Sequence, residues 1–321
     1  MNESSICAIV VTYNRKELLL RCLKAILRQY LLPKSIYIID NASTDGTFKY
    51  ITDNFSFSVD IENNKLIQIG KKCDVEIYYY RMTANEGGAG GFYTGLKLSH
   101  EQNKYDAYWL MDDDGYPSDE CLKRQISFLD SNDYVMPVSI DIDNHTMLSW
   151  ATRKKNDKKT TIYKELIDEW GEILPFVFPF NGCLLSDKIV SEVGYINPKL
   201  FIWGDDYEHY YRCLNKGFNP ITILGAIFYH PVNKAPTVPI LFGKINVPYV
   251  ENKMRFVCLI RNWVYINRHN HRYINLLKSF AAYTWLFLIT KKFDLHNYLL
   301  YLSCVKDGFN ENFDRHFKYL K

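Results

Sequence analysis

Three adjacent aspartates, Asp112, Asp113 and Asp114, are the group in this chain that points most directly to chemistry. Like charges a few ångströms apart repel each other, so such a group is costly unless something positive joins it. Magnesium and manganese prefer carboxylate oxygens together with the phosphate oxygens of a substrate, so the first and third acids can chelate a cation that holds a diphosphate. His230 can add an imidazole ligand, although a lone histidine is more often structural. An acidic turn in solvent is the alternative interpretation.

A second acidic pair, Asp205 and Asp206, stands between Trp203 and Glu208 at the start of an expected helix. The helix dipole favours carboxylates at this position, which is a sufficient structural reason for one of the two. The other can act as a general base that removes the proton of an acceptor hydroxyl. Arg212, near the other end of the helix, is a candidate partner for a phosphate or a carboxylate.

Four glycines, Gly87, Gly88, Gly90 and Gly91, follow Asn85 in a segment that we expect to be a turn from a strand into a helix. Backbone N–H groups and a helix N-terminus in such a turn can approach a phosphate or a sugar closely. The spacing lacks the third glycine of the Gly-x-Gly-x-x-Gly pattern, which argues against a nicotinamide cofactor. A tight turn without a ligand is the alternative.

Short apolar runs that alternate with amphipathic segments predict an α/β fold with a parallel sheet. The predicted strands cover residues 7–12, 35–40, 75–80, 105–111, 134–140 and 221–229, and the predicted helices residues 17–30, 92–100, 120–129, 186–193 and 205–216. The polar stretches 53–72 and 147–170 are expected to be an insertion and a loop. The three aspartates follow the fourth strand directly, at the sheet edge where open α/β proteins bind their ligands.

The last part of the chain, from about residue 243, is predicted to be helical. Arg261, Tyr265, Arg268 and Arg272 lie on one face of its first helix, opposite an apolar face. This basic face is expected to meet an anionic lipid-linked acceptor or a membrane surface, and a solvated helix face is the alternative.

The composition is that of a globular protein, with 47% hydrophobic and 23% charged residues, and excludes a disordered or fibrous chain. Its 39 Lys and Arg residues against 36 Asp and Glu residues leave a charge of +3, too balanced to indicate a nucleic-acid partner. The eight cysteines are scattered singly and predict free thiols in a reducing compartment. No signal-peptide pattern is found, and the longest apolar run, residues 280–290, is shorter than the roughly 20 residues that span a bilayer.

The order of these motifs resembles that of the inverting family-two glycosyltransferases, whose nucleotide-sugar-binding domain has the GT-A fold. The resemblance covers about Cys7 to Pro231 and rests on VTYNR at 11–15, DNASTDGT at 40–47, the three aspartates, and the acid pair with Arg212 downstream. It implies an α/β, Rossmann-like GT-A domain with a mostly parallel sheet over residues 1–240. A helical C-terminal region near the acceptor or the membrane would follow over residues 241–321.

The resemblance also implies roles for individual residues. The nucleotide-sugar donor would be bound by Thr12, Asn14, Arg15, Asp40, Asn85, Gly87, Gly88, Gly90, Gly91 and Asp113, with Asp40 at the uracil. Asp112, Asp114 and His230 would hold Mn²⁺ or Mg²⁺ on the diphosphate. Asp206 would be the general base, and Trp203, Asp205 and Glu208 would contact the acceptor.

The glycine segment and the Trp203 cluster resemble bacterial galactofuranosyltransferases more narrowly, except that Gly204 separates the tryptophan from the acids. This implies inverting, metal-dependent transfer of galactofuranose from UDP-galactofuranose to a hydroxyl of a lipid-linked or oligosaccharide acceptor, in the assembly of a capsule, O-antigen or other envelope glycan. A dTDP-rhamnose-dependent rhamnosyltransferase is the nearest alternative. A catalytically silent sugar-nucleotide-binding protein and a two-metal phosphoryl-transfer enzyme are alternatives from other classes.

The same considerations predict where the protein works. We expect a cytoplasmic protein with peripheral contact at the inner face of the cell membrane and with no nucleic-acid partner. The oligomeric state is not predicted.

Overall fold

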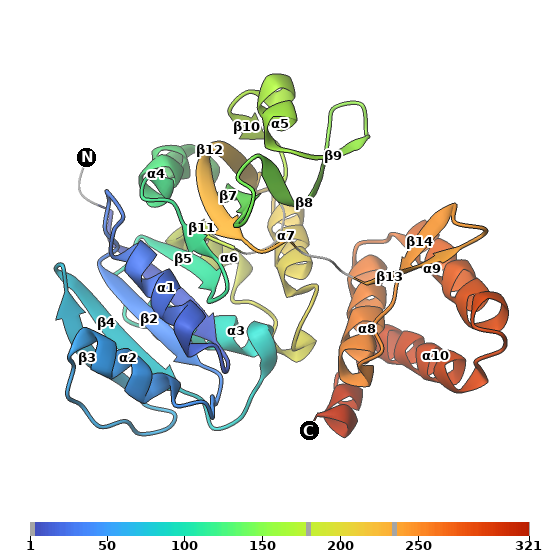
Figure 1. The fold of residues 1–321 in the computed structure, drawn as a ribbon, viewed down its shortest axis with the longest axis horizontal. Helices are drawn as coiled ribbons and strands as arrows, with labels where there is room; N and C mark the ends of the chain where they lie inside the picture. Colours follow the sequence, from blue (N-terminus) through green and yellow to red (C-terminus); the bar gives the residue numbers. More distant parts are fainter. Residues whose placement is uncertain (1–3, 178–180, 233–235, 321) are drawn as a thin grey trace. The chain divides into compact units, whose positions relative to one another are not determined.

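The computed structural model describes residues 4–177, 181–232 and 236–320, and the chain divides into two compact units. The first unit comprises Met1–Pro198 and His209–Asn233, and the second comprises Lys199–Glu208 and Lys234–Lys321. Figure 1 colours the chain from blue at its N-terminus to red at its C-terminus, so that the last helices are orange to red.

The first unit is built on a 12-stranded sheet in the order β10-β12-β7-β11-β5-β1-β2-β4-β3, with β6, β8 and β9 attached outside this path. Its elements in chain order are β1 (Ile6–Thr12), α1 (Lys16–Ile26), β2 (Ser35–Asp40), α2 (Thr47–Phe55), β3 (Leu66–Lys72), β4 (Val75–Arg81), α3 (Gly87–His100), β5 (Ala107–Asp112), β6 (Tyr116–Pro117), α4 (Cys121–Asn132), β7 (Tyr134–Asp141), β8 (Met147–Arg153), β9 (Lys159–Ile162), α5 (Tyr163–Trp170), β10 (Ile173–Leu174), β11 (Cys183–Ser186), α6 (Asp187–Val193), the later part of α7 (Asp205–Asn215) and β12 (Ile221–His230). The 3₁₀-helix η1 (Pro198–Leu200) begins at the boundary, and the first turn of α7 belongs to the second unit. The strands β5, β1, β2 and β4 are mutually parallel, and β7 is parallel to β12. The predicted α/β class with a mostly parallel sheet is confirmed.

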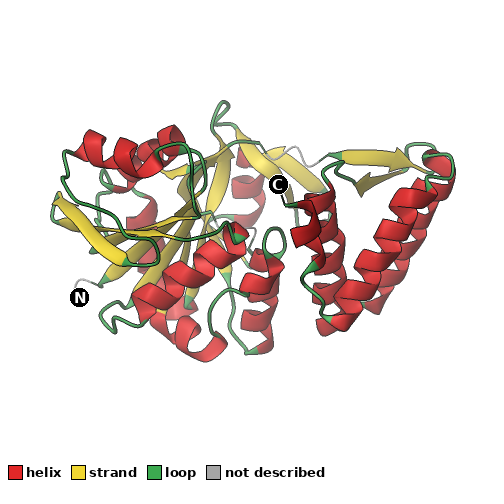
Figure 2. Ribbon diagram, turned by 90° about the horizontal axis from the view of Figure 1, so that it is seen from below, coloured by secondary structure: helices red, strands yellow, loops and turns green. Residues whose placement is uncertain are grey.

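The helices cover both faces of this sheet, as Figure 2 shows. Side chains of a strand point alternately to the two faces. Ile6, Ala8 and Val10 of β1 belong to a buried cluster that also contains residues of α1, α2 and α4. The intervening residues Ile9 and Val11 face α3, where they approach its glycines. A continuous apolar strand is therefore buried on both sides, which is why β1 reads as an unbroken apolar run.

The glycine-rich segment is helix rather than turn, so the expectation of a loop through Gly91 is wrong. The helix α3 begins at Gly87. A Cβ atom at Gly91 would lie 2.5 Å from Cγ1 of Val11, and one at Gly95 would lie 2.4 Å from Cγ2 of Ile9. These two glycines let the helix backbone lie directly on β1, a packing demand that the sequence pattern does not reveal.

The polar stretch 53–72, predicted to be an insertion, contains β3, and the stretch 147–170, predicted to be a loop, contains β8, β9 and α5. Only a few apolar side chains hold the second stretch: Leu148 and Leu166 pack with Val138 and Ile140 in a small buried cluster. Strands and helices anchored by so few apolar residues have no continuous apolar run to predict them from.

The second unit consists of a hairpin and helices. Its elements are β13 (Thr237–Ile240), β14 (Ile245–Pro248), α8 (Lys253–His269), α9 (Tyr273–Trp285), the π-helix η2 (Leu286–Thr290), α10 (Leu295–Asn310) and the 3₁₀-helix η3 (Arg315–Tyr319). An apolar core that includes Phe256, Val264, Leu286, Phe287 and Tyr301 holds them together. In residues 4–177, 181–232 and 236–320, no helix has both the length and the apolar character needed to cross a membrane.

The basic face predicted on α8 is partly covered by the protein itself. Arg261 is fully buried, and its guanidinium donates hydrogen bonds to the backbone oxygens of Leu200 and Phe313. The expectation that this arginine meets anionic lipid is therefore wrong. Helical periodicity groups the arginines on one side of a helix but does not reveal which other segments cover that side.

All eight cysteines are free thiols, as the sequence predicts. Seven of them are buried, and Cys73, between β3 and β4, is exposed.

Candidate functional site

The carboxyl ends of adjacent parallel strands bring several predicted donor-binding residues to one edge of the sheet. In the register of β1 with its two neighbours, Thr12 stands opposite Asp40, and Val11 stands opposite Asp112. Asp113 and Asp114 follow β5 directly. The aspartates therefore lie at the C-terminal end of a central strand, where the sequence places them.

Asp113 is held by residues from both ends of the turn that follows β1. Thr12 Oγ1 donates a 2.7 Å hydrogen bond to Oδ2 of Asp113, and Arg15 Nη1 lies 3.1 Å from its Oδ1. The same Arg15 nitrogen is 2.8 Å from Oδ2 of Asp114. Burial raises the pKa of Asp113 to about 6, although Arg15 and Thr12 act in the opposite direction. Arg15 thus supplies positive charge to the acidic group that the sequence marks as costly.

Asp114 and His230 lie together at the ends of their strands. His230 Nε2 is 3.3 Å from Oδ1 of Asp114, and His230 Nδ1 is 2.7 Å from the backbone oxygen of Pro231. Burial opposes ionisation of Asp114, but His230 and Arg15 hold its pKa below the ordinary value. Burial likewise lowers the pKa of His230, but Asp114 outweighs it, so the pKa of this imidazole is raised.

The fit of these residues to a divalent cation is partial. Oδ1 of Asp114 is buried and has no hydrogen-bond partner of good geometry, so it is an oxygen suited to a cation. Carboxylate and imidazole groups are both ligands of manganese. Within the described residues, however, no three His, Cys, Asp or Glu side chains are arranged to hold a metal ion. The structure thus brings together Asp114 and His230 of the predicted ligand set, without Asp112 completing a group of three.

Asp40 is buried and engaged by the protein itself. Its Oδ1 accepts a 2.8 Å hydrogen bond from the backbone N–H of Ser43, and its Oδ2 accepts a 2.7 Å bond from the hydroxyl of Tyr79. Arg81 Nε lies 3.8 Å from Oδ2. Each carboxylate oxygen has two acceptor positions, so these contacts leave capacity for one further donor such as a base N–H.

Asn14 shapes the loop beside this edge. It adopts a left-handed backbone with φ of 53°, and its Oδ1 accepts a 2.7 Å hydrogen bond from the backbone N–H of Thr44. Its own N–H donates to the hydroxyl oxygen of Ser43. Asn14 therefore joins the loops that follow β1 and β2.

Two residues at this edge carry no predicted role of their own. The buried side chain of Asn41 donates to the backbone oxygen of Gly87 and accepts from the N–H of Glu86, which fixes the start of α3. Arg81 donates to the backbone oxygen of Ser43. Asn41 follows the second strand directly, a position that alone would have made it a candidate.

The glycines of α3 differ in their surroundings. A Cβ atom at Gly88 would have nothing within 4 Å, whereas Gly90 is closed off by Glu86 and Gly91 by Val11. Gly87 has φ of 71°, and its N–H donates to Oδ1 of Asn85. Open space for a ligand is therefore found at Gly88, whereas Gly91 is explained by its close packing against Val11.

The acid pair belongs to the second unit and lies in the first turn of α7. Burial raises the pKa of Asp206 to about 6, against hydrogen bonds from backbone N–H groups. Burial and then the neighbouring Asp206 raise the pKa of Asp205. A carboxyl group with a pKa near neutrality is suited to accept a proton at physiological pH. Trp203, two residues before the pair, is 39% exposed.

Arg212 has a structural contact in the first unit rather than a visible anion site. Its Nη1 and Nη2 donate to the backbone oxygens of Val193 and Tyr195, at and just beyond the C-terminus of α6. Terminal helix carbonyls lack partners within the helix, so an arginine there acts as a cap.

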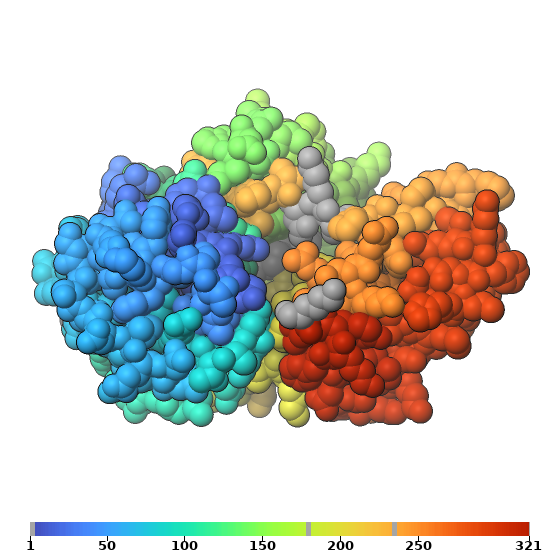
Figure 3. Space-filling view, turned by 60° about the horizontal axis from the view of Figure 1, so that its bottom comes forward, coloured from blue at the N-terminus to red at the C-terminus, as the bar shows by residue number. Residues whose placement is uncertain are grey.

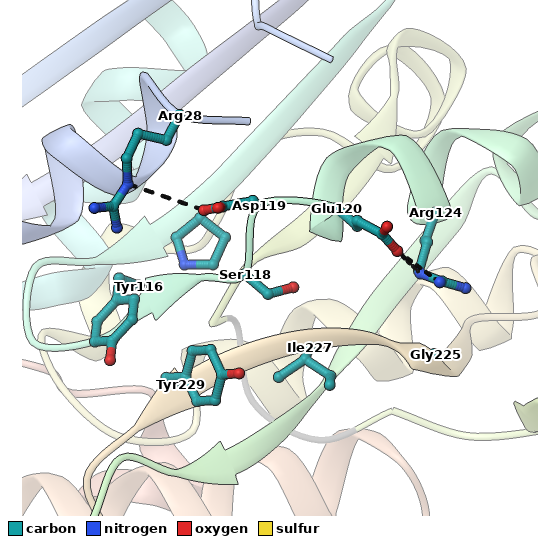
Figure 4. A pocket seen from close by; sticks show the side chains of 10 residues that line it. Arg28, Tyr116, Ser118, Asp119, Glu120, Arg124, Gly225, Ile227 and Tyr229 are labelled. Carbon is teal, nitrogen blue, oxygen red and sulfur yellow. Dashed lines mark hydrogen bonds and ion pairs between the residues drawn. The ribbon is translucent and has the colours of Figure 1, made fainter. Parts of the chain in front are cut away.

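A shallow cavity of about 390 Å³ lies elsewhere in the first unit (Figure 4). The rings of Tyr116 and Tyr229 line it, with centroids 5.2 Å apart, and ion pairs of Arg28 with Asp119 and of Arg124 with Glu120 flank it. None of the predicted site residues lines this cavity.

Together, the residues of the first unit form a polar group at the sheet edge that contains two arginines, three carboxylates and a histidine: Arg15, Arg81, Asp40, Asp113, Asp114 and His230. Such a group suits an anionic ligand with its counter-cation. The second unit carries a carboxyl group with a raised pKa beside an exposed tryptophan. The arrangement has the parts for binding a phosphate ester and for accepting a proton.

Comparison with known proteins identifies relatives along nearly the whole chain. The sequence model of the family described as "Glycosyl transferase family 2" matches residues 7–194. Galactofuranosyltransferase GlfT1 of Mycolicibacterium smegmatis is 26% identical over 322 residues, covering 97% of this chain and 98% of that protein. The dTDP-rhamnosyl transferase RfbF of Shigella flexneri is 24% identical and covers 95% of this chain and 96% of its own.

Solved structures with a similar fold have low sequence identity. S. aureus TarS 1-349 superposes with a TM-score of 0.56 at 14% identity, covering 97% of this chain and 83% of its own. Mannosyltransferase PcManGT from Pyrobaculum calidifontis, in complex with GDP-Man and Mn²⁺, has a TM-score of 0.54 at 15% identity. That match covers 85% of this chain and 65% of the mannosyltransferase chain.

Proposed function

The chain belongs to glycosyl transferase family 2, and from this premise we propose that it transfers galactofuranose from UDP-galactofuranose to a hydroxyl of a growing bacterial surface glycan, with inversion at the anomeric carbon. Family membership and the fold confirm two expectations from the sequence: the chain is a glycosyltransferase, and its fold is the α/β fold of GT-A type. The capsule or O-antigen pathway remains part of the proposal.

The choice of donor sugar is carried by one observation, the similarity to galactofuranosyltransferases over 97% of the chain. The similarity to a dTDP-rhamnosyl transferase over 95% of the chain favours a second candidate, a rhamnosyltransferase with the same fold. A silent sugar-nucleotide-binding protein is the third candidate. The presence of Asp206 at the start of α7 supports a working enzyme, because a binding protein has no need of a proton acceptor.

We assign donor binding to the sheet edge of the first unit. Thr12, Asn14 and Arg15 lie on the loop at the end of β1, and Asp40 at the end of β2 has room for one more hydrogen bond, as a base N–H would donate. Arg15 stands where it can pair with diphosphate oxygens in place of a carboxylate. Gly88, with open space before it, offers backbone N–H groups at the start of α3.

We assign proton removal to Asp206. Its carboxylate takes the proton of the acceptor hydroxyl while that oxygen bonds to the anomeric carbon. The bond from this carbon to the diphosphate oxygen breaks, and the diphosphate leaves with the electron pair. Attack on the face opposite the leaving group inverts the anomeric carbon. Trp203, Asp205 and Glu208, on either side of this carboxylate in the sequence, are the proposed acceptor contacts.

A divalent cation is the proposed cofactor, with Asp114 and His230 as its protein ligands and Asp112 as a third. Bound there, Mn²⁺ or Mg²⁺ would supply positive charge to the leaving diphosphate. The partial fit of the residues and the Mn²⁺ in the structure of the mannosyltransferase support this assignment.

We also propose that the second unit meets a lipid-linked acceptor at the membrane, by a surface other than the arginine face of α8. Ile274 and Leu277 of α9 are 67% and 70% exposed, and Leu295 and Leu299 of α10 are 56% and 63% exposed. Atoms of this part of the chain, orange to red, are at the surface in Figure 3. Exposed aliphatic side chains are costly in water unless a partner or a lipid phase covers them.

Charge favours lipid as that partner. Residues 271–306 contain one acid, Asp294, against a set of basic residues: Arg272, Lys278, Lys291, Lys292 and Lys306. Basic residues among exposed apolar ones are typical of segments that lie on anionic membrane surfaces.

The donor is tested with purified protein and manganese in the presence of UDP-galactofuranose, UDP-galactopyranose or dTDP-rhamnose. The measurement is the loss of sugar from each donor to a lipid-linked or synthetic acceptor. We expect transfer from the furanose alone. Transfer from dTDP-rhamnose would establish the second candidate, and donor binding without transfer in every case would establish the third.

A further inference from the structure

The segment that leads into α7 has an unusual backbone. Phe201 and Trp203 have φ values of 66° and 62°, and Gly204 has φ of 91°. Bulky residues rarely adopt the left-handed region, because Cβ then approaches the neighbouring carbonyl. Such conformations persist only where surrounding contacts enforce them, and they concentrate at functional sites. The contacts that enforce this one come from α8, within the second unit.

Asn262 makes the first of these contacts. Its Nδ2 lies 2.9, 3.0 and 2.7 Å from the backbone oxygens of Leu200, Ile202 and Trp203. The side chain is 1% exposed, so these bonds do not compete with water. One amide group thus gathers three carbonyls of a five-residue segment, which fixes the path of the chain up to Gly204.

Arg261, the preceding residue, supports the same segment. Its Nη2 donates to the oxygen of Leu200, its Nη1 to the oxygen of Phe313, and its Nε to Oδ1 of Asn262. The last bond orients the amide of Asn262 so that Nδ2 faces the carbonyls. Arg261 is fully buried, and among the described residues no carboxylate lies within ion-pair distance of it. Its charge is stabilised by carbonyl oxygens, including one of this segment.

The fit at Gly204 is equally tight. A Cβ atom there would lie 2.9 Å from Cδ1 of Ile266 and 3.6 Å from Cβ of Asn262. Gly204, which separates Trp203 from the acids, is thus the point where this segment touches α8. Asp205 begins α7 immediately afterwards.

We propose that Arg261 and Asn262 are positioning residues, which hold residues 200–204 in the left-handed path and thereby set the direction of the Asp206 carboxylate. The inference rests on the proposed function, in which Asp206 is the base. Neither residue touches the reacting atoms in this account. Both lie beyond residues 7–194, the part matched by the family model.

The test compares Asn262→Ala with Asn267→Ala. Asn267 is also buried on α8, at 2% exposure, but its Nδ2 donates to the oxygen of Trp263 within the helix. We expect kcat to fall at least about tenfold for Asn262→Ala with the KM for donor within twofold, because misplacement of a reacting group costs turnover rather than binding. Asn267→Ala should leave both constants within twofold.

A second measurement does not depend on activity. Hydrogen–deuterium exchange of the peptide spanning residues 199–208 should be at least about tenfold faster in Asn262→Ala and unchanged in Asn267→Ala. If Asn262→Ala does not fold, Asn262→Ser, which keeps one donor, takes its place with an intermediate effect expected. Arg261→Lys, which keeps the charge but loses the forked donors, should resemble Asn262→Ala.

The outcomes separate the two proposals. Unchanged exchange in Asn262→Ala overturns the proposal that Asn262 holds residues 200–204, which we call the clamp. Faster exchange with unchanged kcat overturns the positioning role. A parallel loss of kcat in Asn267→Ala would mean that α8 matters only as a scaffold, which also overturns it. A wild-type enzyme without transfer to any acceptor refutes the proposed function, and the exchange experiment then still decides whether the clamp exists.

Discussion

The hydroxyl of Thr12 donates a hydrogen bond of 2.7 Å to the carboxylate of Asp113, a residue 101 positions further along the chain. The bond joins the ends of β1 and β5 at the sheet edge. It is one of the interactions that favour a charged carboxylate at a site where burial opposes it.

Removal of this hydroxyl should therefore lower both the free energy of unfolding and the affinity for UDP. Thr12→Val, which conserves shape, leaves Oδ2 of Asp113 without its donor. We expect the free energy of unfolding to fall by about 1–3 kcal/mol in chemical denaturation and the affinity for UDP to fall in calorimetry. Thr12→Ser keeps the hydroxyl and should retain most of both. Loss in Thr12→Ser with none in Thr12→Val would mean that the methyl group, not the hydrogen bond, is what matters.

The base assignment predicts a pH profile. Burial raises the pKa of Asp206 to about 6, and a base acts in its ionised form, so kcat should rise as pH increases through about 6 and then level off. Asp206→Asn should lower kcat by about 10²–10⁴-fold and leave donor affinity within twofold. Asp187→Asn, which alters an acid in the first turn of α6, is the control. Turnover in Asp206→Asn close to that of the wild type would exclude this residue as the base.

The raised pKa of Asp206 also affects stability, but its contribution to stability falls as pH rises, whereas kcat increases. A carboxyl with a higher pKa in the folded state binds its proton more tightly there than in the unfolded chain. Its contribution is therefore favourable at low pH and is lost as pH rises from about 4 to about 6. The difference in unfolding free energy between the wild type and Asp206→Asn should change over this window. A difference that stays constant across it would show that folding does not raise this pKa.

Two glycines of α3 should respond differently to alanine. Gly91→Ala places a methyl group 2.5 Å from Cγ1 of Val11, and overpacking of this kind costs about 1–3 kcal/mol. The double variant with Val11→Ala should recover part of that loss. Gly88→Ala meets open space and should keep full stability while binding UDP more weakly. Unchanged UDP affinity would remove Gly88 from the donor site.

The membrane proposal predicts a loss of lipid binding from exposed apolar residues. Ile274→Asp and Leu277→Asp, alone or together, should weaken flotation with anionic vesicles several-fold and leave the fold intact, because both side chains are about two-thirds exposed. Exposed Asp130→Ala on α4 is the control. Equal binding by all variants would refute contact through α9. Loss of a dimer in light scattering, without a change in vesicle binding, would instead identify a second copy of the chain as the partner.

Much of the first unit could be predicted because its strands are apolar on both faces. The strand Ser35–Asp40 is found at the residues expected, and the helix predicted over 186–193 is found at Asp187–Val193, with Ser186 as its N-cap. The position of the three aspartates can be predicted because they follow such a strand. The start of α3 cannot be predicted in this way, because Gly91 and Gly95 are there to contact β1. Contacts with a distant strand leave no local sequence pattern.

The second unit shows more clearly what the sequence pattern cannot predict. The stripe through Arg261 looks like a solvated or lipid-facing surface, because an arginine is rarely buried without a carboxylate. Its partners include backbone carbonyls from residues 200 and 313, and any residue type supplies a carbonyl. Likewise Ile274 and Leu277 have the spacing of a core face but are exposed. Periodicity indicates that a face is apolar and does not reveal what covers it.

The turn at Cys73 makes the protein a ready target for site-specific labelling. The seven other thiols are buried, and buried thiols react slowly because the thiolate forms poorly away from water. A maleimide dye added to the native wild-type chain would therefore attach once, between β3 and β4. Folding can then be followed by a single fluorophore without removing any cysteine.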